Sequence, residues 1–91
     1  MTVTAMTREE LEKSEECAWT LDQITNLTNM PRGSLTSDLE GDLWMDSMDA
    51  WELIVRIEKK YNVKIDEEKM DGIRTVQNVV ELMIALRPLS V

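Results

Sequence analysis

Residues 46–61 read DSMDAWELIVRIEKKY, a run without glycine or proline in which apolar residues recur at helical spacing. This pattern predicts a helix from about Ser47 to about Lys60, with Asp46 placed directly before it as an N-cap. One arc of this helix is apolar and is expected to face a core: Ala50, Leu53, Ile54, Ile57 and Tyr61. The rest of the fold is expected to be arranged around this buried face.

A second apolar arc lies on the opposite side of the same helix. Met48, Trp51 and Val55 stand at i, i+3 and i+7, and a helix in a small domain buries only one side well. We therefore expect these side chains to contact a partner or a cargo; the alternative is that Trp51 is a core residue. Residues 38–52 contain six acids and no Lys or Arg, so a partner that docks there should be basic.

Residues 42–53, DLWMDSMDAWEL, are similar to the modification site of acyl carrier proteins. In that family Asp-Ser-Leu followed by an acidic residue opens the second helix, and the serine carries a 4'-phosphopantetheine arm. The likeness continues through residues 57–66 and through TVQNVV at 75–80, and the family's order of helices spans nearly the whole chain. Two positions depart from the family pattern: Trp44 stands where the family usually has Gly, and Met48 replaces the commoner Leu.

The resemblance implies an all-α fold, a four-helix bundle with three longer helices and one short one, like that of free-standing acyl carrier proteins. It implies that Ser47, next to Asp46, receives the arm from coenzyme A through a separate magnesium-dependent phosphopantetheinyl transferase. Acyl groups would then be held as thioesters for fatty-acid or polyketide-type enzymes, and the protein itself would catalyse nothing. The residues expected to contact basic docking patches on those enzymes are Met48, Asp49, Trp51, Glu52 and Val55.

Two alternatives remain open at the level of sequence. The first is a carrier of aminoacyl or peptidyl groups, because carriers of single amino acids can also show Asp-Ser-Met. The second is an unmodified helical interaction module, in which Ser47 only caps its helix and Trp51 is the hot spot of a stable interface.

Upstream of this region, Thr7 and Glu10 have the spacing of a capping box, which predicts a first helix running to about Asn29 and ending before Pro31. Its inward side is expected to be Leu11, Ala18, Leu21, Thr25 and Thr28, with Cys17 and Ile24 beside them. Cys17 is thus expected to be a small buried residue. We expect a domain over residues 7–87, with a flexible N-terminus at 1–6 and a loose C-terminus at 88–91.

The long connection at residues 31–45 carries Leu35, Leu39 and Leu43 at a spacing of four, which indicates that its own side chains pin it to the core. Residues 62–65 are predicted to form a loop anchored inward by Val63 and Ile65. A short third helix is predicted at 66–70. A last helix is predicted from a cap at Thr75 to about Leu86, with an apolar side made of Val76, Val79, Val80, Leu82, Met83 and Leu86.

Composition narrows the functional classes. The 91 residues carry a formal net charge of −8, which disfavours nucleic acid and anionic membrane surfaces as partners. The sequence shows no apolar run of membrane-spanning length and no signal-type segment, so we expect a soluble cytoplasmic protein. We also expect it to be a monomer. The absence of His argues against a serine hydrolase and against a zinc site. Asp38, Glu40 and Asp42 begin like a calcium loop, but Leu43 occupies the position that needs Gly.

Overall fold

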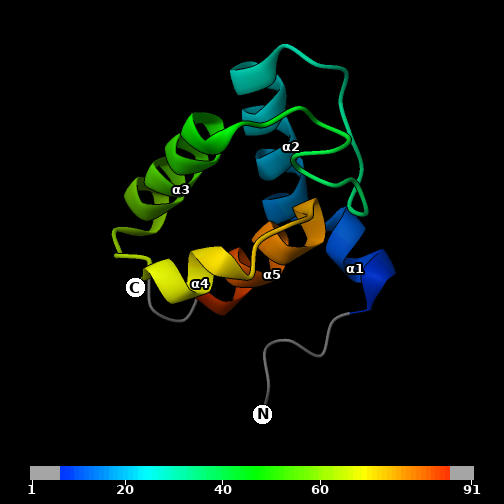
Figure 1. The fold of residues 1–91 in the computed structure, drawn as a ribbon. Coiled ribbons are helices and arrows are strands. Elements are labelled where there is room, and N and C mark those ends of the chain that lie inside the picture. The colour runs from blue at the N-terminus through cyan, green and yellow to red at the C-terminus, as the bar shows by residue number, and fades with distance from the viewer. Residues whose placement is uncertain (1–6, 87–91) are drawn as a thin grey trace.

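The computed structural model describes residues 7–86, and this part of the chain contains five helices (Figure 1). In chain order they are α1 (Arg8–Lys13), α2 (Glu15–Thr28), α3 (Ser47–Tyr61), α4 (Glu67–Asp71) and α5 (Val76–Leu86). The fold is thus an all-helical bundle, as predicted. The predicted loose ends, residues 1–6 and 88–91, lie outside the described residues, as does Arg87.

The predicted single first helix is wrong, because the chain breaks it at Ser14 into α1 and α2. Ser14 is extended, with φ −72° and ψ 154°, and its hydroxyl accepts a hydrogen bond from the Cys17 amide at 3.2 Å as the N-cap of α2. The break shifts the helical phase, so Ala18 is exposed and does not share a buried face with Leu11. The capping box of Thr7 and Glu10 at the start of α1 is confirmed.

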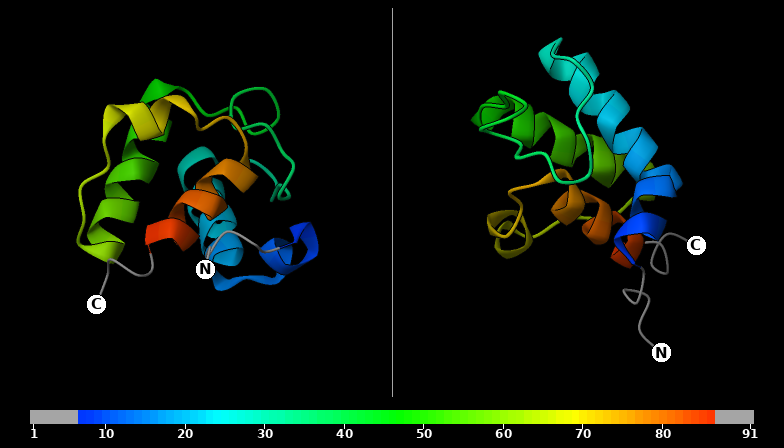
Figure 2. Two further views of the ribbon diagram at one scale, coloured as in Figure 1. Left: turned by 90° about the horizontal axis from the view of Figure 1, so that it is seen from below. Right: turned by 90° about the vertical axis from the view of Figure 1, so that its right-hand side faces the viewer.

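The buried face of α3 packs into the core as predicted. Leu53, Ile54, Ile57 and Tyr61 are all buried, and Ala50 packs against them partly buried. Helix α2 contacts α1, α3 and α5, so the bundle is arranged around it (Figure 2). The contribution of α5 to the core is Val76, Val79, Val80, Met83, Ile84 and Leu86, of which Ile84 was not predicted; Leu82 is only partly buried.

The long connection between α2 and α3 is held to the core and to the start of α5. Leu35, Leu39 and Leu43 are 1%, 6% and 4% exposed, which confirms that the loop is pinned by its own leucines. The Val76 amide donates to the Ser37 carbonyl at 3.1 Å, and the Gln77 amide donates to the Leu35 carbonyl at 2.8 Å. The loop thereby satisfies amides at the N-terminus of α5 that have no partner within the helix.

The remaining predicted elements lie within one residue of their observed positions. Helix α4 begins at Glu67, and Val63 and Ile65 lie partly buried and buried on the loop before it. Thr75 caps α5 by accepting a hydrogen bond from the Asn78 amide at 3.3 Å. Cys17 is buried as predicted, and this burial raises the pKa of its thiol, an effect that Arg32 partly offsets.

Candidate functional site

Ser47 is the first residue of α3, and the structure leaves its side chain exposed. Asp46 before it is extended, and its carboxylate accepts a hydrogen bond from the Asp49 amide at 2.8 Å, which confirms Asp46 as the N-cap. The Ser47 hydroxyl makes no hydrogen bond with any residue between 7 and 86. It is therefore not used as the cap of α3.

The approach to Ser47 is fixed by two buried side chains with an exposed one between them. Leu43 and Met45 are each 4% exposed, and the Met45 amide donates to the Leu39 carbonyl at 3.0 Å. Trp44 between them has φ 58°, in the left-handed region that favours glycine, and its side chain is 72% exposed. The position where the sequence departs from the family's Gly thus has a backbone conformation that suits Gly.

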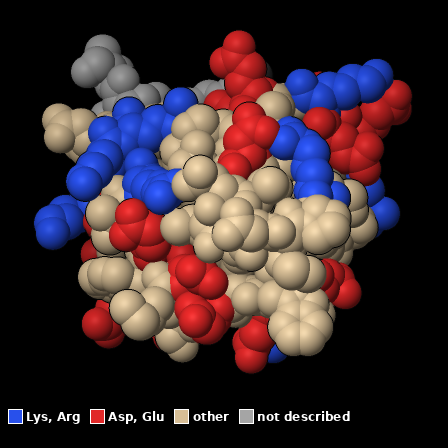
Figure 3. Space-filling view, turned by 90° about the horizontal axis from the view of Figure 1, so that it is seen from above, with Lys and Arg blue, Asp and Glu red and all other residues tan. Residues whose placement is uncertain are grey.

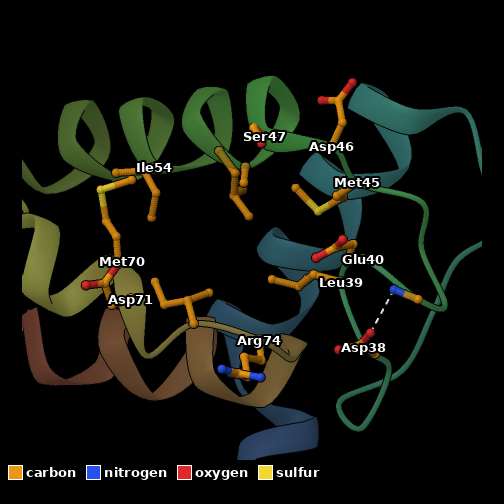
Figure 4. A pocket seen from close by; sticks show the side chains of 14 residues that line it. Asp38, Leu39, Glu40, Met45, Asp46, Ser47, Ile54, Met70, Asp71 and Arg74 are labelled. Carbon is orange, nitrogen blue, oxygen red and sulfur yellow. Dashed lines mark hydrogen bonds between the residues drawn. The ribbon is translucent and has the colours of Figure 1, made fainter.

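An open pocket of about 950 Å³ lies beside Ser47, between α3, α4 and the loop that precedes α3 (Figure 4). Leu39 and Ile54 form part of its apolar floor, and Met70 of α4 faces Ile54 across it. Charged side chains stand around this floor: Asp38, Glu40, Asp46, Asp71 and Arg74. A group attached to Ser47 would therefore have both apolar surface and polar edges within its reach.

The predicted docking residues differ in how available they are. Met48 is 81% exposed and Trp51 is 58% exposed, so the alternative that Trp51 is a core residue is wrong. Glu52 is exposed, Asp49 is partly exposed, and Val55 is half-buried.

Arg56 lies one helical turn beyond Glu52 and pairs with it at 3.4 Å, the Nε of Arg56 facing the carboxylate. The same guanidinium donates to Gln23 at 2.8 Å and to Asn26 at 3.1 Å, both on α2. The Glu52 charge is thus partly engaged within the protein. Asp46 and Asp49 form no ion pair with any described residue.

The exposed large hydrophobic side chains of the described chain all lie between residues 44 and 51, and Trp44 is one of them. Sequence reasoning did not place Trp44 among the docking residues, although its departure from Gly was the signal for it. Figure 3 looks down on the upper end of the molecule and shows uncharged surface bordered by acidic and basic side chains.

Between residues 7 and 86, no group of three or more His, Cys, Asp or Glu side chains is placed to hold a metal ion. None of the helices in the described segment is both long enough and apolar enough to cross a membrane.

Comparison with known proteins gives a family match over most of the chain. The family described as "Phosphopantetheine attachment site" matches residues 18–83. The chain belongs to the acyl carrier protein family. The cofactor of these carriers is 4'-phosphopantetheine, and an exposed, unpaired hydroxyl at a helix N-terminus fits it, because free amides and the helix dipole favour an anionic phosphodiester there.

Individual relatives agree with this assignment. The acyl carrier protein of Saccharopolyspora erythraea is 38% identical over 50 residues, which is 55% of this chain and 53% of that protein. That of Trieres chinensis is 35% identical over 51 residues, 56% of this carrier and 64% of that protein. This chain thus spans 53% and 64% of the length of these two relatives. The match to the acyl carrier protein of Aster yellows witches'-broom phytoplasma covers 80% of it at 31% identity.

Solved structures support the fold of the carrier. A Mycobacterium tuberculosis protein assigned as an acyl carrier protein superposes with a TM-score of 0.67. The alignment covers 78% of this chain and 96% of that one, at 24% sequence identity. Identity this low speaks for the fold alone, and the helical bundle is what the two structures share.

Proposed function

We propose that Ser47 is the attachment residue and that this carrier moves acyl intermediates between fatty-acid or polyketide-type enzymes. The observation that supports this is the Ser47 hydroxyl, which is exposed, unpaired within the described chain and set at the N-terminus of α3 beside the pocket. When attached, the arm supplies a terminal thiol that holds an acyl group as a thioester. The carrier contributes no catalytic group of its own in this proposal.

Loading requires chemistry that Ser47 cannot perform by itself. Its Oγ forms a bond to the phosphorus that bears pantetheine in coenzyme A, and the phosphoanhydride bond breaks so that 3',5'-ADP leaves. A base must accept the serine proton, yet no described side chain is hydrogen-bonded to Ser47 and the chain has no His. The base and the magnesium ion must therefore come from a separate phosphopantetheinyl transferase.

The acids around Ser47 serve recognition in this proposal. Asp46, Asp49 and Glu52 lie within the first two turns of α3 or directly before it, and the whole chain carries a net charge of −8. Attraction between this surface and basic patches on enzymes speeds encounter while dissociation stays fast. Rapid exchange of this kind suits a monomeric, cytoplasmic carrier that visits several enzymes in turn.

The test is the intact mass of the protein after incubation with coenzyme A, magnesium and a broad-specificity phosphopantetheinyl transferase. We expect the parent to gain the mass of one arm and Ser47→Ala to gain none. Circular dichroism of the variant should remain that of the parent, because the lost hydroxyl makes no hydrogen bond within the described chain. An arm on Ser47→Ala, or none on the folded parent, would refute the proposal.

The class of cargo needs a second measurement on the loaded carrier. The arm-bearing protein is offered first to an acyltransferase with malonyl-CoA and then to an amino-acid-adenylating enzyme with ATP and a mixture of amino acids. Gain of a malonyl mass supports a carrier of acyl groups for fatty-acid or polyketide-type enzymes. Gain of an aminoacyl mass alone would favour the carrier of aminoacyl or peptidyl groups.

A further inference from the structure

Trp44 combines two unfavourable features that nothing inside the described molecule offsets. Its backbone lies in the left-handed region, at φ 58°, and its indole is 72% exposed to water. The ring makes no aromatic, cation–π or hydrogen-bond contact with residues 7–86, and it is not among the side chains packed against the core. A strained and exposed aromatic residue of this kind points to a contact made outside the molecule.

The position of Trp44 close to Ser47 favours one kind of partner, an enzyme that acts on Ser47. Any enzyme that modifies the Ser47 hydroxyl has to bring its own surface to that atom. A standard interface buries about 800 Å² on each partner, which corresponds to a disc of about 16 Å radius. Trp44 is three residues from Ser47, so their Cα atoms are at most about 11 Å apart. A footprint of this size centred on Ser47 would therefore reach Trp44.

We propose that Trp44 is a specificity-determining docking residue for the phosphopantetheinyl transferase that loads Ser47. This inference rests on the proposed function of Ser47. The matching surface of the transferase is an apolar recess edged by arginine, because a guanidinium stacks on an indole and pairs with a carboxylate at the same time. Asp42 and Asp46 stand two residues to either side of Trp44, and both are exposed.

The same acids argue against a second copy of this chain as the occupant. Two such copies would bring Asp42, Asp46 and Asp49 of one molecule against the same residues of the other. Like charges facing each other across an interface oppose association. A basic enzyme surface meets no such repulsion.

The first test uses the three tryptophans as internal probes. The full chain carrying Ser47→Ala is labelled with 5-fluorotryptophan, and its ¹⁹F signals are assigned with Trp-to-Phe variants. It is then titrated with a transferase that loads the parent, in the presence of coenzyme A and magnesium. Because the variant cannot accept the arm, the complex stops before chemistry.

We expect the signals of Trp44 and Trp51 to shift or broaden and that of Trp19 to stay in place. Trp19 is the control because the Lys60 ammonium lies 5.3 Å from its ring centroid, and Lys60 is about 20 Å along α3 from Ser47. A Trp51 signal that moves while the Trp44 signal does not would overturn the inference. Failure of the proposed function itself is seen separately, as no mass gain by the parent.

The second test separates the ring from the backbone conformation. Trp44→Ala and Trp44→Gly both remove the indole, but only glycine relieves the left-handed strain. If the ring binds the transferase, both variants should show kcat/KM for loading lowered about tenfold, mainly through a higher KM. Equal kcat/KM for parent and Trp44→Ala would overturn the inference, and so would a loss confined to Trp44→Gly.

Discussion

Trp44 has both a backbone in the left-handed region and a large apolar side chain exposed to water. Two other non-glycine residues of the described chain have positive φ, Asn29 and Asn62. Each is the C-cap of a helix, a position where asparagine tolerates the left-handed conformation. A tryptophan in the left-handed region has no such local compensation. The residues on either side of it, Leu43 and Met45, are both buried.

Glycine at this position should therefore stabilise the fold relative to alanine. We expect the free energy of unfolding of Trp44→Gly to exceed that of Trp44→Ala by about 1 kcal/mol, because only glycine adopts φ 58° without a steric penalty. Urea unfolding followed by circular dichroism measures the difference. Equal stability of the two variants would show that the turn relaxes at no cost.

The residues next to Ser47 show which features of the site can be predicted from the local sequence. Asp46 was predictable as an N-cap because a cap depends only on the few residues around it, and the exposed arc of Met48 and Trp51 follows from helical periodicity. The left-handed conformation of Trp44 does not follow from helical periodicity or capping, and the signal for it is the Gly that the family usually has at this position.

At the scale of elements, the break at Ser14 is the main difference between prediction and structure. Apolar residues continue at helical spacing across Ser14, so periodicity alone favours one helix. The signal that was missed is Ser14 followed by Glu15 and Glu16, a serine before two acids, which is the pattern of a helix N-terminus.

The loop before α3 behaves as a structural element although it contains no helix. Leu39 is 6% exposed, its amide donates to the Arg74 carbonyl at 2.9 Å, and its carbonyl accepts from Met45 at 3.0 Å. It therefore connects the segment before α5 to the segment that leads into Ser47. The link to Arg74 joins residues far apart in sequence, which is why the leucine spacing predicted burial of the loop but not this partner.

We expect Leu39→Ala to lower the free energy of unfolding by about 2–5 kcal/mol, the range for truncating a buried leucine. Glu40→Ala, at an exposed neighbouring position, should change it by less than about 0.5 kcal/mol. Both values come from urea unfolding of the two variants beside the parent. A Leu39→Ala protein as stable as Glu40→Ala would mean that the loop does not carry the core.

At the scale of the whole molecule, the two ends of α3 carry opposite charge. Acids gather around its N-terminal end and the preceding loop, whereas Lys59 and Lys60 lie in its last turn. The arrangement is favourable for the helix dipole at both ends. It also presents a basic partner with one attractive end, where Ser47 lies.

Association with a transferase should therefore depend on salt. We expect kcat/KM for loading of the parent to fall several-fold as ionic strength rises from about 0.05 M to about 0.5 M, since the Debye length contracts over this range. The rate at saturating carrier should change much less, because it does not include encounter. A kcat/KM that stays constant with salt would contradict electrostatic docking.

Cys17 is the single cysteine of the chain, and it is 3% exposed with its thiol pKa raised by burial. Maleimides and aromatic disulfides react with exposed thiolates, so we expect them not to modify the Cys17 thiol in the folded state. In a molecule that carries phosphopantetheine, the end of the arm is then the one thiol open to such reagents. Dyes, surfaces or cross-linkers can be attached there selectively, and Cys17 need not be replaced first.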